Sequence, residues 1–81
     1  MKVRVLYFAV ARELAGVREE TMTLADRATV ADARVAIAVL HPALASTDAR
    51  LRIARNEAFA DDSEPLTDGD VLALIPPVAG G

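Results

Sequence analysis

Residues 65–81 read PLTDGDVLALIPPVAGG, and the prediction of the fold starts from this stretch. Asp68-Gly69 is a strong turn signal, because these residue types adopt the backbone angles of tight turns. Val71–Ile75 is then a near-continuous apolar run, typical of a strand at the centre of a sheet. Pro76-Pro77 ends that strand, since neither proline has an N–H to donate to a neighbouring strand. The sequence thus predicts a central strand followed at once by a short C-terminal segment.

The chain before this stretch supplies candidate neighbours for the central strand. Residues 2–8 show the period-two alternation of a strand, and residues 20–24 alternate again as its antiparallel partner. Residues 12–16 predict a short helical turn ended by Gly16. Residues 51–56 predict a third strand, and the polar segment 61–69 predicts turns.

A helix is predicted after Thr29, which is a good N-cap residue with Asp32 placed to interact with the first amides. Pro42 disfavours helical geometry at the preceding residue, so we expect the helix to end near Leu40 or His41. Apolar residues at steps of three and four form one stripe that should face the core. The stripe consists of Val30, Ala33, Ile37, Leu40 and Leu44.

The order strand, strand, helix, strand, strand predicts an α+β fold of the β-grasp, or ubiquitin-like, type. We expect a mixed sheet of four to five strands with one main helix packed on one face. The β-grasp domain should span residues 1–76, and residues 77–81 should form an extended Gly-Gly tail. Val35 and Val39 fall on the outer face of the helix, either as ordinary exposed valines or as a contact surface.

The composition favours a soluble protein with an apolar core. Hydrophobic residues make up 53% of the chain, and the absence of cysteine excludes disulfides and thiolate metal sites. No apolar run reaches the length of a membrane span, and residues 1–6 alternate instead of forming a signal peptide. We therefore expect a cytoplasmic location.

The net charge of −3 is unevenly distributed. Residues 1–55 hold all nine Lys and Arg with six acids, a balance of +3, whereas residues 56–81 hold six acids and no base. This balance argues against nucleic-acid binding, which needs a basic surface. The acidic third either steers the protein toward a basic partner or consists of acids that each solvate a loop.

The usual catalytic constellations are missing from the sequence. His41 is the one histidine, and its place beside Pro42 at a helix end favours a structural or an exposed histidine over a general base. Asp61 and Asp62 are adjacent carboxylates without a third ligand, so a solvated turn is favoured over a metal site. The remaining candidate is the C-terminal carboxylate of Gly81.

The residue types of the C-terminal segment favour a terminal carboxylate that partner enzymes bind and modify. The two prolines favour an extended chain, and Gly80 and Gly81 lack a Cβ, so the end could thread a narrow channel. A carboxylate reacts only after activation, for example as an acyl-adenylate made by a partner with ATP and magnesium. A sulfur nucleophile could then displace AMP and leave a thiocarboxylate. Terminal glycines alone could also mark a frayed end.

Six short segments of the chain form a recognisable pattern: residues 5–9 (VLYFA), 12–16 (RELAG), 29–30 (TV), 56–57 (NE), 65–70 (PLTDGD) and 76–81 (PPVAGG). With these segments the chain resembles the molybdopterin synthase small subunits over nearly its whole length. The double proline and the Gly-Gly end, joined to the Leu-Thr-Asp-Gly-Asp turn, make the resemblance specific.

The resemblance implies a non-catalytic carrier subunit with a defined reaction cycle. A ubiquitin-activating-like adenylyltransferase would adenylate Gly81, and a sulfurtransferase system would form the thiocarboxylate. The tail would then enter the large synthase subunit, in a heterotetramer of two small and two large subunits, and donate sulfur to cyclic pyranopterin monophosphate. No cofactor is expected on the carrier itself. The tail-threading residues are Pro76, Pro77, Val78, Ala79 and Gly80.

The resemblance also implies a partner-binding surface of Phe8, Phe59 and Ile75. Alternation supports it, because Phe8 and Ile75 face away from the core if Tyr7 and Leu74 face toward it. The alternative, that Phe8 and Ile75 pack under a local loop, is left open by the pattern. Arg55 departs from the family, which usually has an apolar residue there, and so does Ala33, where leucine is common.

Two further functions use the same terminal chemistry. The chain could carry sulfur for another pathway, such as thiamine thiazole synthesis, cysteine synthesis or tRNA thiolation. Thiazole carriers tend to be shorter and to lack the double proline. The chain could instead be a protein modifier that forms isopeptide bonds to lysines of target proteins.

Overall fold

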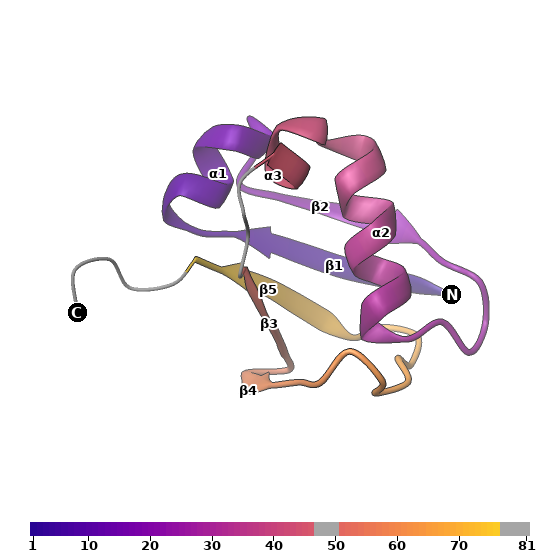
Figure 1. Ribbon diagram of the computed structural model, residues 1–81. Helices are drawn as coiled ribbons and strands as arrows, with labels where there is room; N and C mark the ends of the chain where they lie inside the picture. The colour runs from indigo at the N-terminus through magenta and orange to yellow at the C-terminus, as the bar shows by residue number, and fades with distance from the viewer. Residues whose placement is uncertain (47–50, 77–81) are drawn as a thin grey trace.

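The computed structural model describes residues 1–46 and 51–76 as one sheet with helices above it (Figure 1). The order of the strands and helices agrees with the prediction, although some bounds differ by one to three residues, and the structure adds two short elements, α3 and β4. The elements are β1 (Lys2–Tyr7), α1 (Ala9–Ala15), β2 (Glu19–Thr23), α2 (Val30–Leu40), α3 (Pro42–Ser46), β3 (Arg52–Arg55), β4 (Ala58–Phe59) and β5 (Val71–Ile75).

The sheet has five strands in the order β2-β1-β5-β3-β4. β5 pairs in parallel with β1 and antiparallel with β3, so the sheet is mixed, and β5 is its central strand. The apolar run therefore predicted the position of β5 correctly. Leu72 and Leu74 of β5 are buried under the helices, whereas Val71, Ala73 and Ile75 are partly buried on the opposite face, which no described helix covers.

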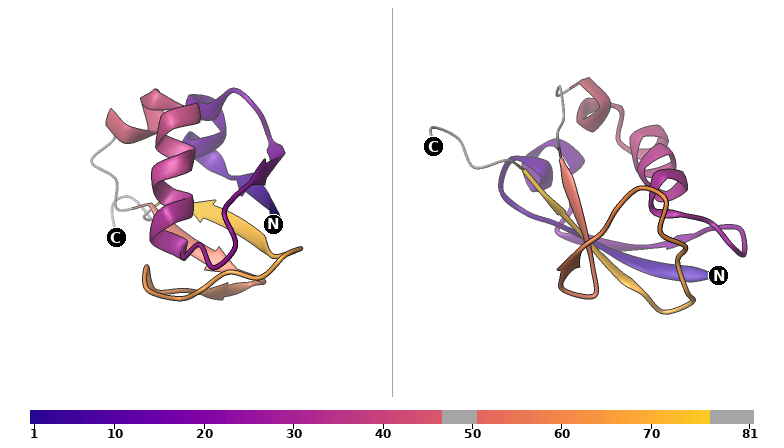
Figure 2. Two further views of the ribbon diagram at one scale, coloured as in Figure 1. Left: turned by 90° about the vertical axis from the view of Figure 1, so that its right-hand side faces the viewer. Right: turned by 60° about the horizontal axis from the view of Figure 1, so that its bottom comes forward.

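The helices α1, α2 and α3 all lie on one side of the sheet, which the turned views make plain (Figure 2). The predicted β-grasp arrangement, a mixed sheet with one main helix across a face, is confirmed. The opposite side of the sheet carries no helix of the described residues. Within residues 1–46 and 51–76, no helix combines the length and the apolar character that a membrane span requires.

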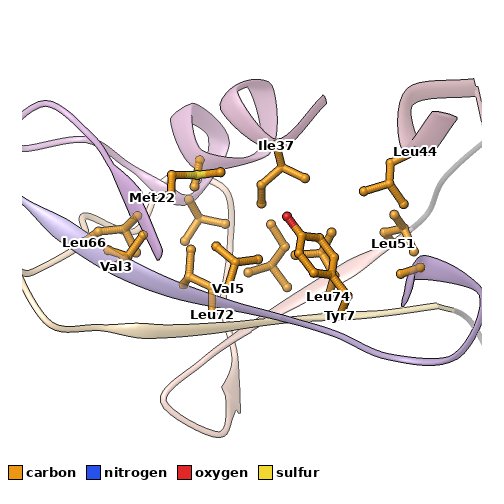
Figure 3. Close-up of a cluster of buried hydrophobic side chains, with 14 residues drawn as sticks. Val3, Val5, Tyr7, Met22, Ile37, Leu44, Leu51, Leu66, Leu72 and Leu74 are labelled. Atoms are coloured by element: carbon orange, nitrogen blue, oxygen red, sulfur yellow. The ribbon is translucent and has the colours of Figure 1, made fainter. Parts of the chain in front are cut away.

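The hydrophobic core fills the space between the sheet and the helices (Figure 3). Val5 and Leu72 are completely buried on neighbouring strands, and Ile37 of α2 packs onto them from above. Each such side chain stabilises the fold by roughly 1.5–3 kcal/mol relative to an exposed position. Tyr7 and Leu74 extend this layer toward the ends of the two parallel strands, where the C-terminal segment begins.

The helix signals of the sequence are confirmed at both ends of α2. Thr29 accepts a hydrogen bond from the N–H of Asp32, and the Asp32 carboxylate accepts one from the N–H of Thr29, a complete capping box. The helix ends at Leu40, before Pro42. In α1, Gly16 follows the last residue with φ of 78°, the left-handed geometry that glycine adopts without strain.

The prediction that Leu40 belongs to the core stripe is wrong. Leu40 is 55% exposed, whereas Ile37 and Leu44 are buried. The physical reason is that α2 ends at Leu40 and the chain turns into α3, so Leu44 reaches the core from a different helix. Val35 and Val39 are exposed, as expected for the outer face of α2.

The third strand is one residue shorter than predicted at each end, and at its C-terminal end the chain turns at Asn56 and Glu57. Both residues have positive φ, 51° and 72°, and this geometry reverses the chain into β4. Asn56 is well suited to the left-handed region, but Glu57 is not. The hairpin of β3 and β4 forms the edge of the sheet next to β5.

Asp70 is a buried carboxylate at the start of β5, so its interpretation as an acid that merely solvates a loop is wrong. It is 6% exposed and accepts hydrogen bonds from Arg55 Nε (2.8 Å), Asn56 Nδ2 (3.0 Å) and the N–H of Thr67 (2.8 Å). Burial by itself would raise the pKa of Asp70, but these donors and the charge of Arg55 hold it below its ordinary value. Arg55, the departure from the family pattern, thus has a structural partner.

Candidate functional site

An apolar hollow lies on the side of the sheet opposite the helices. It encloses about 590 Å³, and its lining is mostly aliphatic and aromatic, with Asn56 and Glu57 as the polar members. We call this surface the docking hollow. Its apolar lining consists of Leu6, Phe8, Ala54, Phe59, Val71, Ala73 and Ile75.

The strand register explains why the sheet is hollow at this place. Leu6 lies opposite Ala73, Ala73 opposite Ala54, and Ala54 opposite Phe59, so the four side chains form one row across the sheet. Two alanines occupy the middle of the row, and larger side chains stand at its ends. The alanines form a floor, and Leu6 and Phe59 form walls.

The three residues proposed to bind a partner are brought together at this hollow. Phe8 is 43% exposed and Phe59 is 54% exposed, while Ile75 is half-buried. Phe8 and Ile75 each follow a parallel-paired residue, Tyr7 and Leu74, so they lie at the same end of the sheet. Phe8 is therefore not packed under a loop, and the expectation that Phe8 and Ile75 face away from the core agrees with the structure. Their contact with a partner stays a prediction.

Arg52 is a further residue of this surface, and the sequence analysis did not single it out. Its guanidinium carbon lies 3.7 Å from the centre of the Phe59 ring, a cation–π contact. Arg52 also pairs across the sheet with Ile75. The alternation along this strand could have placed Arg52 on this surface, since Arg52 and Ala54 must share the face opposite Ile53.

The C-terminal segment leaves the sheet at the edge of the docking hollow. β5 ends at Ile75, whose side chain lines the hollow, and Pro76 is the next described residue. The remaining tail residues of the prediction, Pro77, Val78, Ala79, Gly80 and the reactive Gly81, lie outside the described residues.

The polar cluster of Tyr7, Glu20 and His41 lies on the helix side of the sheet. One oxygen of Glu20 accepts from the Tyr7 hydroxyl at 2.5 Å and lies 2.5 Å from His41 Nε2, and the two rings meet edge to face at 5.4 Å. Burial and then the Glu20 carboxylate raise the pKa of Tyr7 above its ordinary value. Burial opposes ionisation of Glu20, but hydrogen bonds from Tyr7 and His41 hold its pKa below the usual value.

This cluster ties β1 and β2 to the end of α2, so the predicted structural role of His41 agrees with its contacts. In the part of the chain that the structure describes, no group of three or more His, Cys, Asp or Glu side chains could hold a metal ion.

Comparison with known proteins gives near full-length similarity to one family. The ThiS family model matches residues 5–81. The molybdopterin synthase sulfur carrier subunit of Chlamydomonas reinhardtii is 45% identical, with 100% of both chains covered. The protein of that name from Escherichia coli is 42% identical, covering 98% of this chain and 99% of its own. Small archaeal modifier protein 1 of Haloferax volcanii is 40% identical over 91% of this chain and 94% of its own.

Solved structures agree with the fold. The crystal structure of the Haloferax volcanii modifier protein superposes with a TM-score of 0.90 at 36% identity and covers both chains completely. A complex of subunits 1 and 2 of the molybdopterin-converting factor from Helicobacter pylori contains a chain with a TM-score of 0.71 at 29% identity, again with complete coverage of both chains.

Proposed function

Because the chain belongs to the ThiS family, we propose that it is a sulfur carrier and the small subunit of a molybdopterin synthase. The observation that carries the proposal is the docking hollow, which holds Phe8, Phe59 and Ile75 and adjoins the start of the C-terminal segment. Relatives named molybdopterin synthase sulfur carrier subunit, similar over their full length, support the assignment.

The reacting group in this proposal is the carboxylate of Gly81. One carboxylate oxygen attacks the α-phosphorus of ATP on an adenylyltransferase, and pyrophosphate leaves with magnesium assistance. The resulting acyl-adenylate has AMP as a good leaving group. Hydrosulfide, or a donor that supplies sulfur at the same oxidation level, attacks the carbonyl carbon, the C–O bond to AMP breaks, and a thiocarboxylate remains on Gly81.

The loaded carrier then delivers its sulfur on the large synthase subunit. The docking hollow binds that subunit, and the tail from Pro76 to Gly80 places the thiocarboxylate against cyclic pyranopterin monophosphate. The dithiolene product needs two sulfurs, so two loaded carriers are consumed per product molecule. The catalytic groups belong to the partners, in a cytoplasmic heterotetramer of two small and two large subunits. The Helicobacter pylori complex of subunits 1 and 2 supports a two-subunit assembly.

Intact-mass spectrometry tests the carrier function directly. The chain is incubated with a molybdopterin synthase adenylyltransferase, magnesium-ATP and a sulfur donor, beside a variant that lacks Gly81. We expect one oxygen of the full-length chain to be replaced by sulfur and the mass of the truncated chain to stay unchanged. An unchanged full-length chain, with an enzyme that loads a control carrier, contradicts the proposal.

The second candidate function is protein modification, favoured by the 40% identity to the Haloferax volcanii modifier protein. Both functions begin with adenylation of Gly81, but a modifier ends in an isopeptide bond to a target lysine. Gel analysis of cells that express the chain distinguishes them. High-mass conjugates that disappear on deletion of Gly81 indicate modification, whereas a chain that stays free indicates a carrier.

A further inference from the structure

Two charged side chains belong to this face of the sheet: Glu57 lines the docking hollow, and Arg52 lies beside it, against the ring of Phe59. Arg52 lies at the start of β3, opposite Ile75 and therefore next to the start of the C-terminal segment. Glu57 lines the hollow from the turn that follows β3. β3 spans roughly 10 Å from Arg52 to Arg55, and Glu57 lies beyond its far end in the turn, so the two charges are separated along the sheet. Figure 1 shows β3 running from the end of β5 toward this turn.

The ring of Phe59 positions the Arg52 side chain, but no carboxylate of the described residues pairs with its charge. The ring of Phe59 holds one face of the guanidinium at 3.7 Å, and that contact leaves the N–H groups at the rim available. Among residues 1–46 and 51–76, no carboxylate or carbonyl accepts a hydrogen bond from Arg52. A protein that covers Phe59 and Ile75 must therefore supply an acceptor or leave the cation poorly solvated.

Glu57 is also held without a partner of opposite charge. Its φ of 72° is in the left-handed region, which disfavours side chains with a Cβ, yet a carboxylate occupies the position. No arginine, lysine or histidine of the described residues forms an ion pair with it. Glu57 therefore presents a negative charge at the hollow, beyond the end of β3 that is distant from the tail.

We propose that Arg52 and Glu57 set the orientation in which this face docks on the large synthase subunit, an inference that rests on the proposed function. The matching surface of the partner is apolar in its middle, carries a carboxylate opposite Arg52 and carries a lysine or arginine opposite Glu57. An apolar contact alone has little directionality, whereas opposite charges separated along it favour one orientation and penalise the reversed one. That orientation directs the segment after Ile75 toward the partner's active site.

Titration calorimetry of the full chain against the large subunit tests this inference. We expect Arg52→Glu to weaken binding roughly 10- to 100-fold and Glu57→Arg about 10-fold, because each places like charges together at the interface. Arg52→Gln should weaken binding less than Arg52→Glu, and it should reduce the dependence of affinity on salt. Arg27→Glu, in the turn between β2 and α2, is the control: it changes the net charge as much as Arg52→Glu does. Its affinity should stay within about twofold of that of the unmodified chain.

The variants also separate this inference from the function on which it rests. If Phe8→Asp weakens binding while Arg52→Glu and Glu57→Arg bind like the unmodified chain, the orientation role is overturned and docking stands. The orientation role is likewise overturned if Arg27→Glu weakens binding as much as Arg52→Glu, because general charge is then the cause. If the unmodified chain does not bind the large subunit, both proposals fail. Equal urea midpoints of the variants show that each one is folded.

Discussion

Replacing the Asp70 carboxylate by an amide should measure how much its hydrogen bonds stabilise the turn before β5. We consider Asp70→Asn, which keeps the shape and removes one acceptor. The carboxylate accepts at both oxygens: Oδ2 from Arg55 Nε and the Thr67 N–H, and Oδ1 from Asn56 Nδ2. An amide has only one oxygen, so in either orientation its NH2 faces a donor. Asn56 cannot rotate its own amide to compensate, because its Oδ1 accepts from the N–H of Val71 at 2.9 Å.

The magnitude follows from these contacts. Hydrogen bonds to a charged acceptor contribute about 1.5–3 kcal/mol each, and an unsatisfied buried group costs a further 1–3 kcal/mol. The Arg55 side chain is 30% exposed, so water replaces part of what it loses. We expect Asp70→Asn to lower the free energy of unfolding by about 2–3 kcal/mol, and the melting temperature by roughly 10 °C or more.

Urea unfolding as a function of pH is the assay. The pKa of Asp70 in the folded chain lies below its ordinary value, so the ionised form is favoured by folding. Its stabilisation is present above the unfolded pKa, about 3.9, and is lost as the pH falls through the folded pKa. The difference between wild type and Asp70→Asn should therefore be large at pH 7 and shrink toward pH 2. Asp61→Asn, the same exchange at an exposed acid, should cost less than about 0.5 kcal/mol.

Two results would refute this reasoning. A cost below about 0.5 kcal/mol at pH 7 would mean that the three hydrogen bonds contribute no net stability. A cost that stays constant between pH 7 and pH 2 would mean that shape, and not charge, determines the effect of the exchange.

The other predictions concern the docking hollow and the core. Phe8→Asp should weaken binding of the large subunit about tenfold or more, because it buries a charge in an apolar contact. Val39→Asp, on the exposed face of α2, is the control and should leave the affinity unchanged. Titration calorimetry compares the two variants, and equal affinities would remove Phe8 from the interface. In urea unfolding, Ile37→Ala should lower the free energy of unfolding by about 2–4 kcal/mol, because Ile37 is buried. Leu40→Ala should lower it by less than about 1 kcal/mol, because Leu40 is exposed. Similar losses for the two variants would contradict the exposure of Leu40. Glu57→Gly should raise the free energy of unfolding by about 0.5–1 kcal/mol, since glycine adopts a φ of 72° without strain. The same variant should bind the large subunit more weakly. A lower free energy of unfolding would show that the backbone at Glu57 is not strained.

Much of the fold could be predicted from local patterns. The run from Val71 to Ile75 predicted the central strand, and the capping signals of Thr29 and Asp32 predicted the start of α2. Such signals depend on residues within a few positions of one another, so a single sequence contains them. The exposure of Phe8 was also accessible, because alternation along β1 needs no knowledge of distant segments.

Errors arose where distant segments decide the outcome. Leu40 fits the helical period but is exposed because α2 ends there, whereas Leu44 of the same predicted stripe is buried from α3. Asp70 reads as one of several loop acids, and only the folded chain brings Arg55 and Asn56 against it.

Local sequence patterns were sufficient to predict the β-grasp order of elements, the central strand and its prolyl end, and a C-terminal Gly-Gly whose chemistry requires partners. The tertiary structure alone decided the docking hollow and the charges that adjoin it. Ala73 and Ala54 form a floor only because β5 and β3 pair in one register, and Arg52 meets Phe59 only across the β3–β4 hairpin. Register joins segments that are far apart in the chain, and a shift of one residue would turn each side chain to the other face.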